Sequence, residues 1–124
     1  MKTDKKGMDR MGEYVHVDAD FAELVINTYR NIKQLKAQLQ AIPYLLSEEL
    51  FAGSHALTYL LNNALEDMPK DRVLQNITSG IALTQRLIKV NSSIDSTTQE
   101  ISGSLEAILA NFQLLQSTIS FKVK

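Results

Sequence analysis

Residues 94–119 read IDSTTQEISGSLEAILANFQLLQSTI, and their apolar side chains recur at alternating intervals of four and three residues. This rhythm places one apolar stripe along a helix of about seven turns, and such a stripe must be buried against other helices. Only Thr98 departs from the apolar pattern. The sequence therefore predicts a helical packing element, whose stripe is Ile94, Thr98, Ile101, Leu105, Ile108, Phe112, Leu115 and Ile119.

The flanks of this stripe carry small or neutral side chains, whereas a solvent-facing coiled coil normally carries opposite charges there. The charged residues between Asn91 and Ser120 are Asp95, Glu100 and Glu106. We expect a helix with so few charges to contact protein on more than one side. The flanking positions are Asp95, Thr97, Ser102, Ser104, Leu109, Asn111, Gln116 and Thr118.

Three earlier segments carry stripes of the same kind, at about 20–42, 44–66 and 69–90. The first stripe is Phe21, Val25, Thr28, Ile32, Leu35, Leu39 and Ile42. The second is Leu46, Leu50, Gly53, Leu57, Leu60 and Ala64, and Leu61 and Leu65 widen this face. The third is Leu74, Ile77, Ile81, Thr84 and Ile88, with a second apolar edge of Val73, Leu83, Leu87 and Val90.

Local signals mark the ends of these segments. Asp20 with Glu23 predicts a capped start of the first helix, and Pro43 interrupts its pattern. Pro69 suits the first position of the third helix. The last two helices, at 69–90 and 93–119, meet without glycine or proline, but Ser92 with Asp95 forms a second capping pattern.

We therefore predict an all-α fold, an antiparallel four-helix bundle with the last two helices separated. The alternative is that these two are fused into one long helix, which would require an intertwined dimer to cover its apolar face. Residues 13–124 form one helical domain, and residues 1–12 are expected to be a flexible tail. Short alternating patterns at 13–18 and 119–124 are typical of strands or extended arms, which could pair within one subunit or between subunits.

Composition excludes several classes of function. The chain has no cysteine and a net charge of −1, which argues against thiol chemistry and against a nucleic-acid partner. Its apolar runs are shorter than the roughly 20 residues of a membrane span. The first residues lack the apolar core of a signal peptide, so we expect a cytoplasmic protein with no membrane contact.

The two histidines, His16 and His55, have no ligand partner at a spacing that places two ligands on one helix face. We therefore expect no metal and no other cofactor. The run from His55 to Tyr59 resembles, in outline, the motif of histidine-containing phosphotransfer domains, which are helical bundles of similar size. Leu57 matches that motif, while Thr58 and Tyr59 stand where it has a lysine and a small residue. The resemblance implies a phosphate-accepting role for His55.

No pattern of catalytic residues occurs, so we do not expect an enzyme. The favoured interpretation is a small protein–protein interaction module, such as an adaptor, inhibitor or assembly factor. It is expected to bind a larger protein through the helices at 69–90 and 93–119, and to form a homo-oligomer. A signalling or small-ligand-binding helical oligomer is the alternative. The predicted partner or oligomer interface is Leu105, Ile108, Leu109, Phe112, Leu114 and Leu115.

Overall fold

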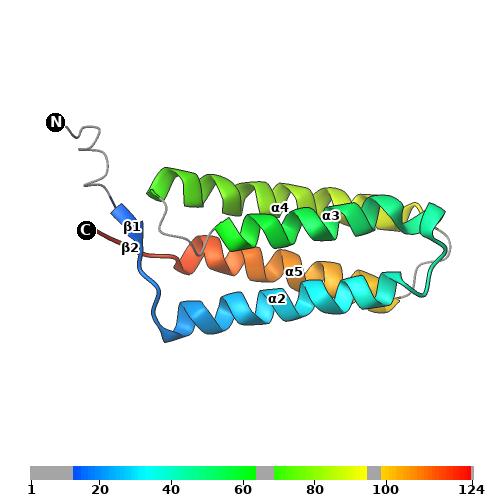
Figure 1. Ribbon diagram of the computed structural model, residues 1–124, viewed down its shortest axis with the longest axis horizontal. Coiled ribbons are helices and arrows are strands. Elements are labelled where there is room, and N and C mark those ends of the chain that lie inside the picture. Colours follow the sequence, from blue (N-terminus) through cyan, green and yellow to red (C-terminus); the bar gives the residue numbers. More distant parts are fainter. Residues whose placement is uncertain (1–12, 64–68, 95–98, 124) are drawn as a thin grey trace.

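Four long helices lie side by side and alternate in direction, as the sequence predicts (Figure 1). The computed structural model describes residues 13–63, 69–94 and 99–123. Helix α2 packs on α3 and α5, and α4 packs on the same two helices. The helices are α2 (Ala19–Leu39), α3 (Tyr44–Asn63), α4 (Lys70–Ser92) and α5 (Gln99–Thr118), so the fold is an up-and-down four-helix bundle.

The last two helices are separate, and the alternative of one fused rod is therefore wrong. Helix α4 ends at Ser92, and the backbone N–H of Ser93 bonds back to the carbonyls of Val90 and Asn91. Ser92 lies in the last turn of α4, where its hydroxyl donates to the Lys89 carbonyl at 2.7 Å. It does not cap α5, which begins later than predicted, at Gln99. Asp95, its predicted capping partner, lies outside the described residues.

Two predicted helix starts are shifted by one or two residues. Asp18, not Asp20, caps α2, because its Oδ1 accepts a hydrogen bond from the Phe21 N–H at 2.8 Å. Asp20 instead lies inside the first turn, where a carboxylate interacts favourably with the helix dipole. Pro69 is the residue before α4 rather than its first helical residue.

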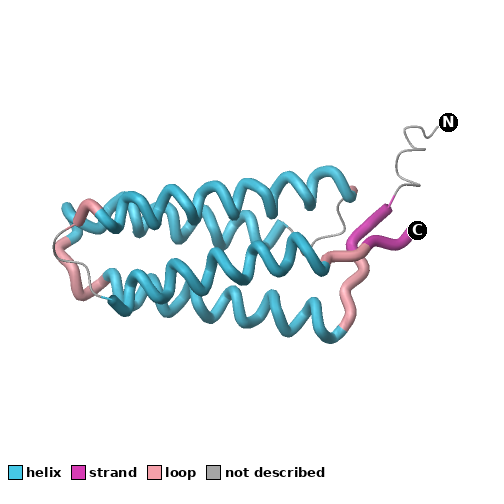
Figure 2. Tube along the Cα trace, turned by 180° about the vertical axis from the view of Figure 1, so that it is seen from behind, coloured by secondary structure: helices cyan, strands magenta, loops and turns pink. Residues whose placement is uncertain are grey.

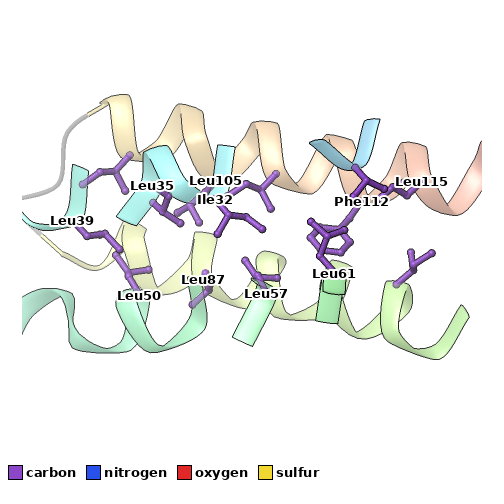
Figure 3. Close-up of a cluster of buried hydrophobic side chains, with 14 of the residues drawn as sticks. Ile32, Leu35, Leu39, Leu50, Leu57, Leu61, Leu87, Leu105, Phe112 and Leu115 are labelled. Carbon is purple, nitrogen blue, oxygen red and sulfur yellow. The ribbon is translucent and has the colours of Figure 1, made fainter. Parts of the chain in front are cut away.

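The core confirms the predicted stripes of α2 and α5, and it confirms those of α3 and α4 in part. On α3, the predicted Leu50 and Leu57 are fully buried and so is Leu61 of the wider face, whereas Leu60 is only half-buried. On α4 the buried face lies between the two predicted sets. Ile77 and Thr84 of the stripe are buried, and so are Val73 and Leu87 of the second edge. Figure 3 shows leucines of α3 and α4 on one side and of α2 and α5 on the other, which point toward one another across the core. The buried positions of α4 are Val73, Ile77, Gly80, Thr84, Leu87 and Asn91.

The two ends of the chain pair at one end of the bundle (Figure 2). Strands β1 (Glu13–Val15) and β2 (Phe121–Val123) are antiparallel, with Tyr14 opposite Lys122, so they pair within one subunit. Tyr14 also bridges to Pro69, and the Lys70 ammonium lies 5.3 Å from the centre of the Phe121 ring. The two-stranded sheet thereby joins the start of α2, the start of α4 and the end of α5. The predicted tail, residues 1–12, lies outside the described residues.

Candidate interaction site

Most of the predicted interface lies inside the bundle. Leu105, Ile108, Phe112 and Leu115 are fully buried in the core formed with the other helices. Leu109 is half-buried, and Leu114 keeps 49% of its surface exposed. A partner cannot reach core side chains without opening the bundle. The accessible part of the predicted interface is therefore Leu109 and Leu114.

The neutral flanks of α5 make hydrogen bonds within the chain. Two bonds cross to α2, where Asn111 Nδ2 donates to Asn31 Oδ1 at 2.7 Å and the Ser104 hydroxyl donates to Gln38 Oε1 at 2.8 Å. Two more cross to α4, from Asn91 Nδ2 to Ser102 Oγ at 2.9 Å and from Gln116 Nε2 to Thr78 Oγ1 at 3.4 Å. Amides and hydroxyls therefore replace the expected ion pairs, and these flanks serve the bundle itself.

One stretch of the α2–α5 boundary stays open. Here a groove of about 370 Å³ lies between the first turns of α2 and the last turns of α5. Its apolar part comprises the buried Phe21, the half-buried Leu24 and the exposed Leu114. The other described lining residues are Asp18, Asp20, Glu23, Asn27 and Thr118.

The groove is acidic. The described residues that line it include three carboxylates, Asp18, Asp20 and Glu23, and no basic side chain. All three carboxylates are exposed, and Asp18 also caps α2 by accepting a hydrogen bond from the Phe21 N–H. Arg30 approaches the end of the lining most distant from Asp18, where its Nη1 donates to Asn27 Oδ1 at 3.4 Å. The negative charge is thus concentrated where α2 begins.

The outer face of α3 is the second unusual surface. Tyr44 and Tyr59 are 61% and 67% exposed, and His55 is exposed between them. The His55 ring packs edge-on against the half-buried Phe51 ring, with 5.1 Å between the ring centres. The charged residues of α3 are limited to Glu48 and Glu49, near its start.

A cation from the neighbouring helix contacts the residue three positions after this histidine. The Lys36 ammonium on α2 donates to Thr58 Oγ1 at 3.3 Å. Thr58 follows His55 by three residues, and side chains at this spacing are neighbours on one side of a helix. The position where the phosphotransfer motif has a lysine is therefore approached by a lysine from α2.

The outer face of α4 is polar, although the sequence analysis assigned α4 to the interface. Its exposed side chains are almost all polar or charged, and Arg86 pairs with Glu49 of α3 at 3.2 Å. Such a pattern is typical of a solvated helix surface. The exposed residues of α4 are Asp71, Arg72, Gln75, Thr78, Ser79, Ala82, Gln85, Arg86, Lys89 and Ser92.

The α2 wall of the groove was not identified from the sequence. The sequence marks Asp20 and Glu23 only as residues of a helix start, and Leu24 lies off the apolar stripe. The available signal was the combination of these features: three carboxylates within the six residues from Asp18 to Glu23, followed by an off-stripe leucine. Nothing in the sequence, however, indicated that Leu114 lies opposite them.

Within the ranges that the structure describes, no three acidic, histidine or cysteine side chains gather as metal ligands would. The helices of the same ranges lack the combination of length and apolar content that a bilayer span requires. Comparison with known protein families, with curated proteins and with solved structures finds no significant match to this chain.

Proposed function

We propose that the chain is a small helical protein–protein interaction module that binds a larger protein through α5 and the adjoining part of α2. The exposure of Leu114 within an open groove carries this proposal. Large apolar side chains on a soluble surface are unremarkable singly, but an apolar groove with a polar rim is typical of interaction sites. The polar outer face of α4 offers less apolar contact, so we place the surface on the α2 side of α5.

Capture of binding proteins from the native host tests the proposal. The wild-type chain is compared with Leu114→Asp and with Ile26→Asp as a matched control. Ile26 is equally exposed, at 50%, but does not line the groove. We expect a defined partner to be retained by the wild type and by Ile26→Asp and lost with Leu114→Asp. Equal recovery of every bound protein by all three chains would contradict the proposal.

The homo-oligomer remains a prediction. The outer face of α3, with Tyr44 and Tyr59 exposed, offers aromatic area for a contact between copies. Light scattering at high micromolar concentration measures the mass directly. A dimer or larger species is expected, and a strict monomer at that concentration would contradict it.

A second candidate function is phosphate acceptance by His55, the signalling alternative. It is supported by the exposure of His55 in the middle of α3 and by the Lys36 ammonium beside Thr58. The phosphodonor is an acyl phosphate, such as the phosphorylated aspartate of a partner protein. A ring nitrogen of His55 forms the N–P bond while the donor's P–O bond breaks; the donor carboxylate leaves, and the ring releases a proton to solvent. The Lys36 ammonium stabilises the transferring group electrostatically.

Acetyl phosphate is the probe for this second function. We expect the intact mass of the chain to rise by one phosphoryl group, in an adduct that is stable in alkali and labile in acid. His55→Gln abolishes the adduct, Lys36→Met slows its formation, and His16→Gln leaves it unchanged. An adduct that forms equally on His55→Gln would exclude His55 as the acceptor.

A further inference from the structure

We propose that the groove between α2 and α5 receives a basic amphipathic helix of the partner protein. This inference rests on the proposed function and adds the chemistry of the occupant. The side of the partner helix that faces the groove carries apolar side chains such as leucine, and the flanks of that helix carry lysine or arginine. The inference combines three observations: the shape of the groove, its apolar floor and the sign of its charge.

The shape favours a helix as the occupant. The walls of the groove are two antiparallel helices, with Phe21, Leu24 and Asn27 on α2 and Leu114 and Thr118 on α5. A third helix that lies along such a boundary inserts side chains at intervals of three or four residues. The volume of about 370 Å³ accommodates a few anchoring side chains and leaves the helix itself on the surface.

The floor selects apolar anchors. Leu114 and Leu24 both present surface to the groove, and Phe21 closes it from below at 6% exposure. The side-chain hydrogen bonds between α2 and α5 lie further along the helices, at Asn31–Asn111 and Gln38–Ser104. Among the described residues, none joins the two walls of the groove. An apolar side chain inserted here therefore displaces water without breaking an existing polar contact.

The charge selects cations beside those anchors. Asp20 and Glu23 are exposed on the α2 wall, and the described lining contains no basic residue. Lysine or arginine on the incoming helix would complement these carboxylates, which accelerates association and excludes acidic partners. The same argument disfavours a second copy of the chain in a two-fold contact at this groove. Such a contact would bring the carboxylates of both copies, Asp20 and Glu23 of each, into one interface.

Two designed peptides of equal length test the inference. Both carry leucine at helical spacing; the polar face of one is lysine and that of the other is glutamate. Binding to the full chain is followed by fluorescence anisotropy at low and high salt. We expect the leucine–lysine peptide to bind at least about tenfold more tightly than the leucine–glutamate peptide, with a preference that decreases as salt screens the charges.

Charge reversal on the protein provides the decisive comparison. Glu23 and Glu48 are both exposed and both occupy the fifth position of their helices, so lysine at either site perturbs the helix dipole equally. Glu23→Lys should weaken binding of the leucine–lysine peptide at least about fivefold, and Glu48→Lys by less than about twofold. Leu114→Asp should also weaken it, whereas Ile26→Asp should not. Equal effects of the two lysine variants would mean attraction by net charge, and would overturn the inference.

Other occupants give different results. If the leucine–glutamate peptide binds more tightly and depends on Leu114, the groove is an interaction site and the proposed function stands, but the basic helix is wrong. If Lys5→Gln with Lys6→Gln raises peptide affinity severalfold, the chain's own basic residues compete for the groove, which overturns its assignment to a partner.

If Leu114→Asp converts an oligomer into a species of lower mass in solution, the occupant of the groove is a second copy of the chain. If neither peptide responds to Leu114→Asp, both proposals for this surface fail together.

Discussion

Gly80 on α4 lies directly against the ring of Phe112 on α5. A Cβ atom added at Gly80 would stand 2.5 Å from Cε1 of that ring, which is far inside van der Waals contact. Both residues are buried, and the ring therefore occupies the space that a side chain at position 80 would fill. The close packing of α4 on α5 at this level depends on the absence of that side chain.

Gly80→Ala is expected to lower the free energy of unfolding by about 1 kcal/mol or more. Alanine improves helix propensity by about 0.5–1 kcal/mol, but overpacking of a core costs about 1–3 kcal/mol. Gly103 is the control, because an added Cβ there meets nothing within 4 Å. Gly103→Ala should raise stability by about 0.5–1 kcal/mol. Urea denaturation followed by circular dichroism measures both, and shifts of the same sign would contradict this packing.

Phe112→Ala should lower the free energy of unfolding by about 3–5 kcal/mol, because it removes a fully buried ring and leaves a cavity. Leu114→Ala, two residues further along α5, should change it by no more than about 0.5 kcal/mol because its side chain is half exposed. The same urea titrations measure both. Comparable losses would show that Leu114 belongs to the core and not to an accessible groove.

Asn91→Leu is expected to raise the free energy of unfolding by about 1 kcal/mol. Among the described residues, Asn91 Oδ1 is buried without a hydrogen bond, and such an orphaned acceptor costs about 1–3 kcal/mol. Ser102→Ala should have the opposite effect, since it removes the acceptor of Asn91 Nδ2 and leaves the whole amide unpaired. Thermal and urea unfolding report both changes. Destabilisation by Asn91→Leu as large as that by Ser102→Ala would show that the amide is needed where it is.

Stability should fall in alkali through Tyr29. Burial raises the pKa of the Tyr29 hydroxyl above its ordinary value of 10.0, and this hydroxyl donates to Asn62 Oδ1. In the pH window between the ordinary and the raised pKa, the unfolded chain has released the proton that the folded chain keeps. The free energy of unfolding therefore decreases as the pH rises through that window. Tyr29→Phe should reduce this decrease, and Tyr59→Phe, at an exposed tyrosine, should not. Urea unfolding at about pH 8 and about pH 10.5 measures the difference.

The helices themselves were predictable because their causes are local. Alternation of four and three residues specifies an amphipathic helix, and the stripes of α2 and α5 are buried as that pattern requires. Helix ends were less accurate, since Asp18 and Asp20 are both suitable caps and the extended backbone at Asp18 makes it the cap in the folded chain. The predicted stripes of α3 and α4 are only partly correct, and on α4 the reason lies in the residue types. Gly80 and Asn91 lie on the buried face of α4 but carry no apolar side chain to indicate it.

The candidate site depended on contacts between distant segments. The unusual neutral flanks of α5 were evident in the sequence, yet whether they bind a partner or the chain itself was not. The structure pairs Asn111 with Asn31 and leaves Leu114 open beside Asp20 and Glu23, although all five belong to the same two helices.

The sequence by itself determined that this chain forms four amphipathic helices with short alternating ends, because helical periodicity and strand alternation act over a few residues. Only the tertiary structure decided which helix faces meet, because packing fits a large side chain of one helix into a space left by a small residue on another. Gly80 is the small residue and Phe112 the large side chain. The same docking of α2 against α5 decides that Leu114 remains exposed in an acidic groove while Leu115 is enclosed in the core.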